Sequence, residues 1–149
     1  MSGDAQSLTE IARIRALKAC ELVDVSVKKL SPYDPEHVTT PEQQEPYDAL
    51  SDRLMRAVET CLKFFRSYEN YTEGENSDTV RDLLNRMEKL RLISDTHRWM
   101  EMRDVRNRIV HDYIPEQVKK LYDLMMGEFA VELQNTASRI KQVRQNQNA

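Results

Sequence analysis

Apolar residues recur every three or four positions along most of this chain, a spacing that places them on one side of an α-helix. Runs of Val, Ile and Thr that alternate with polar residues, as strands require, are absent from the sequence. Leu, Met, Glu, Arg and Lys are abundant, and there are only 3 glycines. A chain of 149 residues suffices for one domain with a sizeable core and is too short for two. These features predict an all-α, up-and-down bundle of four or five helices.

The first helix and the segment after it follow from capping residues and prolines. Ser7–Glu10 is expected to form a capping box that opens the first helix, and Ser31-Pro32 to end it. The segment 31–46 contains four prolines and no helical period, so it is expected to be a connector in which Thr40–Gln43 makes a short turn at most. The apolar side of the first helix is expected to consist of its larger side chains: Leu8, Ile11, Ile14, Leu17, Leu22 and Val25.

The remaining helices are placed by the same signals. The second helix is expected to begin near Pro46, with proline in its first turn, and to end at about Tyr71. A polar loop at 73–77 should follow it. The next two helices are expected to be capped by Ser77 and by Ser94 or Asp95. Ile114-Pro115 is expected to interrupt the helical pattern, and the last helix follows it. The helical domain is expected to span residues 1–141, followed by a polar, frayed tail at 142–149.

Charge and cysteine content restrict the functions open to such a bundle. A formal charge of −3 excludes a broadly basic coat for nucleic acid, so any contact with RNA must be made at a local site. Cys20 and Cys61 lie in apolar-patterned helical stretches and are expected to be a reduced, buried pair. The N-terminal residues lack the apolar core of a signal peptide, and no apolar run approaches membrane-spanning length. A cytoplasmic protein with no membrane partner is therefore expected.

The expected fourth helix places an arginine among apolar side chains. At about 100° per residue, Arg106 falls in the middle of a stripe whose other members are Trp99, Met102, Ile109, Val110 and Tyr113. A guanidinium group keeps its charge, and burying it alone costs several kcal/mol. Arg106 is therefore expected to meet a carboxylate, a phosphate, or a wet cleft between two protein surfaces. Asp52 and Glu59 of the second helix are the candidate structural partners.

Two further residues near the end of this helix can take part in chemistry. His111 projects about 140° away from Arg106, and Asn107 lies one turn before His111 on the same side. A straight helix therefore does not direct Arg106 and His111 at a common point, whereas a two-fold dimer packed near this stretch would bring two copies of the set together. Taken singly, each residue has a structural explanation: an interface ion pair for Arg106 and a helix cap for His111. A plain dimeric bundle thus remains an alternative at this stage.

The stretch Trp99–Tyr113 resembles the signature of HEPN domains, and among them the HepT-like toxins. That signature is an arginine, four to six residues of which the first is polar, a histidine, one residue and a tyrosine. Arg106, Asn107, His111 and Tyr113 match every position of it. The order of elements from the second helix onward is also similar, so the resemblance covers most of the chain, with the proline-rich connector as its least typical part.

The resemblance implies a HEPN-like homodimer in which the paired motifs line a cleft at the subunit interface. It also implies a metal-independent endoribonuclease that needs no cofactor. HepT-like proteins are the toxin half of a two-component system, and their antitoxin is a minimal nucleotidyltransferase that silences the toxin by transferring AMP to the motif tyrosine, here Tyr113. A sister group is described instead as a non-catalytic substrate-binding subunit of the nucleotidyltransferase. That description is the alternative function.

The residues fit cleavage of RNA by its own 2′-hydroxyl. His111 can remove or return a proton near neutral pH, Arg106 can bind the scissile phosphate, and Asn107 can orient either group. The sequence contains no Cys-x-x-Cys, His-Glu-x-x-His or Glu-x-x-His pattern, and His97 with Glu101 would supply only two ligands. No metal is therefore expected. An adenylyl group on Tyr113, about 20° from Arg106 around the helix, would occupy the phosphate site.

Overall fold

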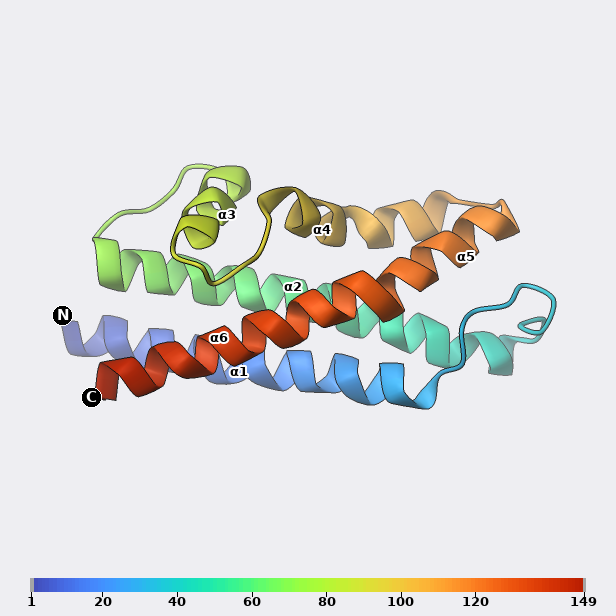
Figure 1. The fold of residues 1–149 in the computed structure, drawn as a ribbon, viewed down its shortest axis with the longest axis horizontal. Helices are drawn as coiled ribbons and strands as arrows, with labels where there is room; N and C mark the ends of the chain where they lie inside the picture. Colours follow the sequence, from blue (N-terminus) through green and yellow to red (C-terminus); the bar gives the residue numbers. More distant parts are fainter. Residues whose placement is uncertain (1, 149) are drawn as a thin grey trace.

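The helices of this protein pack as two long antiparallel partners with the remaining elements laid against them (Figure 1). The computed structural model describes residues 2–148, and the side chains of residues 3–143. No strand occurs within this described part, so the predicted all-α class is confirmed. α5, η1 and α6 follow one another without a break. When they are counted as one helix, the described part of the chain has five helices, the larger of the two numbers predicted. The elements are, in chain order, α1 (Ser2–Lys29), α2 (Pro41–Glu73), α3 (Val80–Lys89), α4 (Thr96–His111), α5 (Pro115–Leu124), the π-helical turn η1 (Met125–Phe129) and α6 (Ala130–Asn148).

Helix α1 departs from the prediction in its start and in its buried side. It begins at Ser2, so the proposed capping box at Ser7–Glu10 lies inside the helix and that prediction is wrong. Its buried side consists mostly of small residues such as Ala16, Ala19 and Cys20, whereas four of the larger apolar side chains expected there are exposed: Leu8 (63%), Ile11 (48%), Ile14 (52%) and Val25 (38%). Small side chains let two helix backbones approach closely, so α1 packs on α2 through them and leaves the larger ones outside.

The two cysteines meet at this α1–α2 contact. Cys20 and Cys61 are both buried and unbridged, and their Sγ atoms are 3.9 Å apart. The hydrogen bond between the two thiols and burial raise the pKa of Cys61 well above its ordinary value. The predicted reduced, buried pair is confirmed.

Helix α2 begins five residues earlier than predicted. Thr40 is its N-cap and accepts a hydrogen bond from the backbone N–H of Gln43, whose side chain in turn accepts from the Thr40 N–H. Pro46 therefore lies inside the helix, where its missing N–H forfeits one hydrogen bond of the second turn. The reciprocal cap satisfies two backbone donors and offsets that loss, so the short turn expected at Thr40–Gln43 is in fact the first turn of a long helix.

Three tyrosines fasten the connector to the end of the bundle where α4 meets α5. Tyr33 stacks on Tyr122 with ring centroids 4.5 Å apart and meets Tyr47 edge-on at 5.1 Å. The Tyr47 hydroxyl donates to the Ser31 carbonyl at 2.7 Å, and Gln44 Nε2 donates to the Tyr122 hydroxyl oxygen at 3.1 Å. Burial, with a smaller contribution from the nearby Asp48 carboxylate, raises the pKa of Tyr122 to about 12. The connector is thus held by side-chain contacts in place of helical hydrogen bonds.

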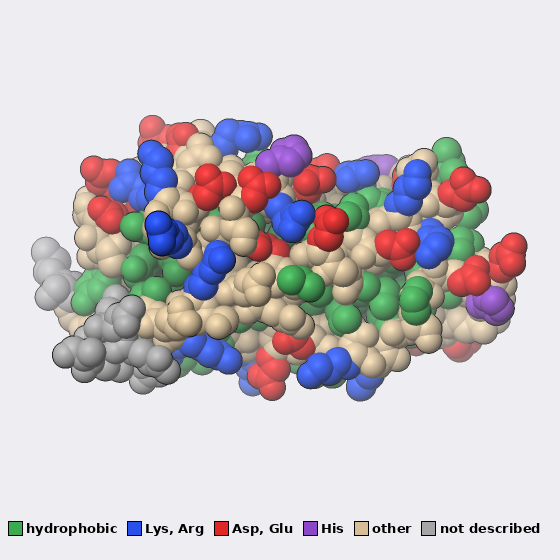
Figure 2. All heavy atoms as spheres, in the orientation of Figure 1, with side chains coloured by type: hydrophobic (Ala, Val, Ile, Leu, Met, Phe, Trp, Pro, Cys, Tyr) green, Lys and Arg blue, Asp and Glu red, His purple; other side chains and the backbone are tan. Residues whose placement is uncertain are grey.

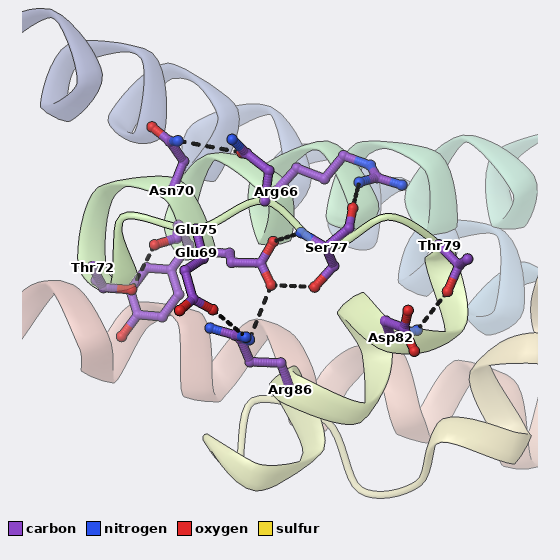
Figure 3. A network of polar contacts seen from close by, with 11 residues as sticks. Arg66, Glu69, Asn70, Thr72, Glu75, Ser77, Thr79, Asp82 and Arg86 are labelled. Atoms are coloured by element: carbon purple, nitrogen blue, oxygen red, sulfur yellow. Dashed lines mark hydrogen bonds and ion pairs between the residues drawn. The ribbon is translucent and has the colours of Figure 1, made fainter.

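A buried carboxylate holds the loop at the opposite end of α2 (Figure 3). Glu69, only 1% exposed, accepts from the backbone N–H of Ser77 at 2.6 Å and from its hydroxyl, and it pairs with Arg86 Nε at 3.1 Å. Ser77 therefore anchors the loop to Glu69 and does not cap a helix. The N-cap of α3 is Thr79, which accepts a hydrogen bond from the Asp82 N–H at 3.0 Å. The prediction that Ser77 caps this helix is wrong by two residues.

Helix α4 is fixed to the core by its first two turns. Asp95 caps it, as one of the two predicted candidates, and accepts from the N–H groups of His97 and Arg98. Trp99 is fully buried, packs edge-on against Phe65 at 5.4 Å, and donates its Nε1–H to Glu132 Oε2 of α6 at 2.8 Å. These contacts hold α4 between α2 and α6 and so position the residues that follow on it.

The chain is helical from Pro115 to Asn148. α5 begins at Pro115, at the break predicted for Ile114-Pro115, and α6 continues to Asn148, into the segment expected to be a frayed tail. No helix in the described part of the chain is long and apolar enough to cross a membrane. On the face shown in Figure 2, acidic and basic side chains are interspersed and neither forms a continuous coat.

Candidate functional site

The last two turns of α4 are less buried than its first turns, although Ile109 still packs against the core. Burial along this helix ends at Val105, and the next three residues, Arg106, Asn107 and Arg108, are all exposed. Arg106, predicted to meet a carboxylate, a phosphate or a wet cleft, is therefore exposed in the single chain. The wheel gives the direction of Arg106 correctly, since Trp99 and Met102 on the same side are buried, and Met55 of α2 contacts Arg106 from that side. Val110 is 61% exposed.

Arg106 forms neither of the expected ion pairs. Its Nη1 contacts the Sδ atom of Met55 in α2 at 3.1 Å. Asp52, one of the two predicted partners, is paired instead with Arg56 at 2.9 Å. Within the part of the chain that the structure describes, no carboxylate lies within ion-pair distance of Arg106. Its charge is therefore available to an anion from outside.

Arg106 faces a polar hollow between α2 and α4. The hollow has a volume of about 460 Å³, and Asn107 lines it together with Arg106. Two of the four predicted site residues are thus brought together within one chain. Arg103 also lines it and was missed by the sequence analysis, because an exposed arginine on a charged helix face carries no signal of its own. The complete lining is Met55, Glu59, Met100, Arg103, Asp104, Arg106 and Asn107.

The other two predicted residues lie further along the chain. His111 is the last residue of α4, is exposed, and is not part of the lining of the hollow. Tyr113 is 89% exposed in the short link to α5, where the Asp112 carboxylate accepts from the Ile114 N–H at 3.1 Å. Because α4 is a regular helix up to His111, one copy of the chain does not direct Arg106 and His111 at the same point.

The donor groups of this region do not form a metal cage. His97 and Glu101 lie 3.5 Å apart on the first two turns of α4 and make an exposed pair, which supplies two ligands at most. No group of three or more His, Cys, Asp or Glu side chains that could hold a metal ion occurs among the described residues. Besides the cation, amide, imidazole and phenol of the predicted residues, the region offers the carboxylates of Glu59 and Asp104, which line the hollow.

Comparison with known proteins gives one result. Neither the curated proteins nor the solved structures contain a significant match to this chain. A family model does match residues 23–142, a range that takes in the whole of α2 to α5 and all four predicted site residues. The chain belongs to the family described as nucleotidyltransferase substrate binding protein like.

Proposed function

We propose that this protein is a HEPN-like, cytoplasmic toxin that cleaves RNA without a metal ion and is silenced by a nucleotidyltransferase antitoxin. The observation that carries the proposal is the guanidinium of Arg106, which forms no ion pair with any described residue and faces a polar hollow beside Asn107, with His111 exposed further along α4. The description of the family, which names a nucleotidyltransferase, supports the choice of partner.

The proposed reaction uses a nucleophile that RNA itself supplies. His111 removes the proton of a 2′-hydroxyl, and the 2′-oxygen then forms a bond to the adjacent phosphorus. The bond from phosphorus to the 5′-oxygen breaks, and this oxygen takes up a proton, which leaves a 2′,3′-cyclic phosphate and a free 5′-hydroxyl. Arg106 binds the phosphoryl oxygens and stabilises the charge that develops on them, while Asn107 orients a phosphate oxygen or the imidazole.

A homodimer completes the proposed site. Arg106 and His111 of one chain point about 140° apart around α4, so a second subunit is needed to bring an imidazole to the arginine. The end of α4 offers exposed apolar side chains for such a contact, since Val110 is 61% and Ile114 is 59% exposed. Packing two copies at this end would cover those side chains and enclose the hollow.

A second candidate function is a non-catalytic subunit that presents a substrate to a nucleotidyltransferase. The family description favours it directly, and so does the separation of Arg106 from His111 within one chain. In that case the hollow would bind a phosphate group of the substrate without cleaving it. Both candidate functions require the hollow to bind a phosphate group. They differ in whether a bond of that phosphate is then cleaved.

Removing the charge of Arg106 separates these candidates from a purely structural role. We expect Arg106→Gln to lower the rate of RNA cleavage by roughly 10²–10³-fold, because a donor to the developing phosphoryl charge is lost. Met55→Glu should have an effect in the same direction, because a carboxylate placed against the guanidinium would compete with phosphate. Both sites are at least partly exposed, so stability should change little. Cleavage of a labelled RNA and thermal unfolding are the measurements.

The matched controls are Arg108→Gln, which removes the same charge from the far side of α4, and Met55→Leu, which keeps the packing. Both should retain wild-type activity. If wild type binds RNA or nucleotide but cleaves nothing, the binding-subunit function replaces the ribonuclease. If Arg106→Gln and Arg108→Gln behave alike in both binding and cleavage, neither candidate function uses this hollow.

The proposed regulation depends on the accessibility of Tyr113. Because 89% of its surface is exposed, its hydroxyl can reach the active site of a partner enzyme and attack the α-phosphorus of ATP, with release of pyrophosphate. Incubation with the cognate nucleotidyltransferase and ATP should add one AMP by mass and abolish RNA cleavage. Tyr113→Phe should gain no mass and stay active. An adduct that persists in Tyr113→Phe would place the modification elsewhere.

A further inference from the structure

The candidate hollow contains a second arginine that the motif does not include. Arg103 is exposed and lines the hollow together with Arg106 and Asn107. No carboxylate lies within ion-pair distance of Arg103 in the described part of the chain. Glu59 and Asp104 line the same hollow, yet within the described residues neither lies within ion-pair distance of these arginines. Two guanidinium groups outside ion pairs therefore face a space that two carboxylates also line.

Helix geometry sets the arrangement of these groups. Arg103 and Arg106 are three residues apart, so they are neighbours on the helix surface, displaced by about 4.5 Å along its axis. Arg103, Asn107 and His111 are spaced by four residues and form one row along α4. Arg103 lies at the end of this row away from His111. A strand whose scissile phosphate meets Arg106 and an imidazole would thus bring a neighbouring phosphate to Arg103.

We propose that Arg103 binds the phosphate adjacent to the scissile one, so that the site recognises two consecutive phosphates of a single strand. This inference rests on the proposed ribonuclease function and adds a requirement for substrate length. A dinucleoside monophosphate, which has only the scissile phosphate, lacks the contact with Arg103. A flexible single strand can place successive phosphates on one helix face, and each such contact with a guanidinium group strengthens binding without reading the base.

The test measures whether the effect of one additional phosphate on the substrate depends on the Arg103 side chain. The minimal substrate is a ribonucleoside joined to a deoxyribonucleoside, so that only one bond can be cleaved. Two longer versions carry an additional phosphate at the 5′ or at the 3′ end. For wild type, kcat/KM should rise roughly tenfold with the additional phosphate on one of the two sides, mainly through KM.

The variant Arg103→Gln should lose this gain and cleave the minimal substrate at the wild-type rate. Arg108→Gln, which removes an equal charge outside the hollow, should keep the gain. Wild type should also show a steeper dependence of binding on salt than Arg103→Gln, by about 0.7 in the slope of log K against log salt.

Two failures are distinguishable. If wild type cleaves none of the three substrates and also fails to cleave any longer RNA strand, the proposed ribonuclease function is overturned. If wild type cleaves RNA and the gain persists in Arg103→Gln, or if that variant is impaired equally on all three substrates, Arg103 is not a ligand of the second phosphate. A purely structural role would produce the uniform impairment and not the selective loss.

Discussion

Replacing His111 with alanine is expected to lower RNA cleavage by roughly 10²–10⁴-fold, the usual contribution of a positioned acid or base. The imidazole is exposed at the end of α4 and makes no contact with the core, so folding should be nearly unaffected. Binding of an uncleavable 2′-deoxy strand should be retained, because Arg106 supplies the phosphate contact in this proposal. The measurements are kcat/KM for a single-ribonucleotide substrate and binding of its deoxy counterpart.

The matched control is His97→Ala on the same helix. His97 is also exposed and pairs with Glu101, but it lies outside the hollow, so this variant should cleave at the wild-type rate. Equal activity of wild type and His111→Ala would contradict the assignment of His111 as the base or acid. Loss of deoxy-strand binding along with cleavage would assign it to substrate binding instead.

The proposed dimer makes a further, quantitative expectation about His111. If each site combines Arg106 of one subunit with the imidazole of the other, a mixture of Arg106→Gln and His111→Ala subunits contains heterodimers with one intact site. Random pairing should then restore about a quarter of wild-type activity from two inactive proteins. A site contained within one chain would give no restoration on mixing.

The helical pattern predicted the fold class and most element positions, and it failed where two effects compete. For α1, apolar periodicity selects the larger side chains such as Leu8 and Ile14, yet the core side is the one with alanines and Cys20. Periodicity measures hydrophobicity and contains no information on how closely two helices approach. For α2, Pro46 is a frequent first-turn residue, but the Thr40–Gln43 cap satisfies the helix end earlier.

The candidate site could be located in sequence but not assembled from it. The helical wheel gives the side of α4 on which Arg106 lies. How fully the neighbouring helices cover that side at each position along α4 depends on their lengths and crossing angles. The sequence therefore leaves open whether Arg106 meets a carboxylate, a phosphate or a wet cleft, and the side chain is found exposed. The contact with Met55 and the role of Arg103 in the hollow depend on the facing residues of α2, which no periodicity in α4 can indicate.

Removal of the single tryptophan is expected to have the largest effect on stability. Trp99 is fully buried, meets Phe65 edge-on at 5.4 Å and donates a hydrogen bond to Glu132, which is itself only 2% exposed. Trp99→Ala should lower the free energy of unfolding by about 3–5 kcal/mol, the usual cost of truncating a buried aromatic side chain to alanine. Urea unfolding followed by circular dichroism is the suitable measurement, because the variant lacks the fluorescent probe.

Two conservative variants divide this loss into packing and hydrogen bonding. Trp99→Phe keeps a ring against Phe65 but leaves the Glu132 carboxylate with the Ser94 N–H, at 2.9 Å, as its one remaining donor among the described residues, and should cost about 1.5–3 kcal/mol. Glu132→Gln keeps an acceptor oxygen and should cost less than Trp99→Phe. A loss below about 1 kcal/mol for Trp99→Ala would contradict this packing. Because the contacts of Trp99 position the turns of α4 that line the hollow, RNA cleavage by Trp99→Ala should fall at least in proportion to the folded fraction.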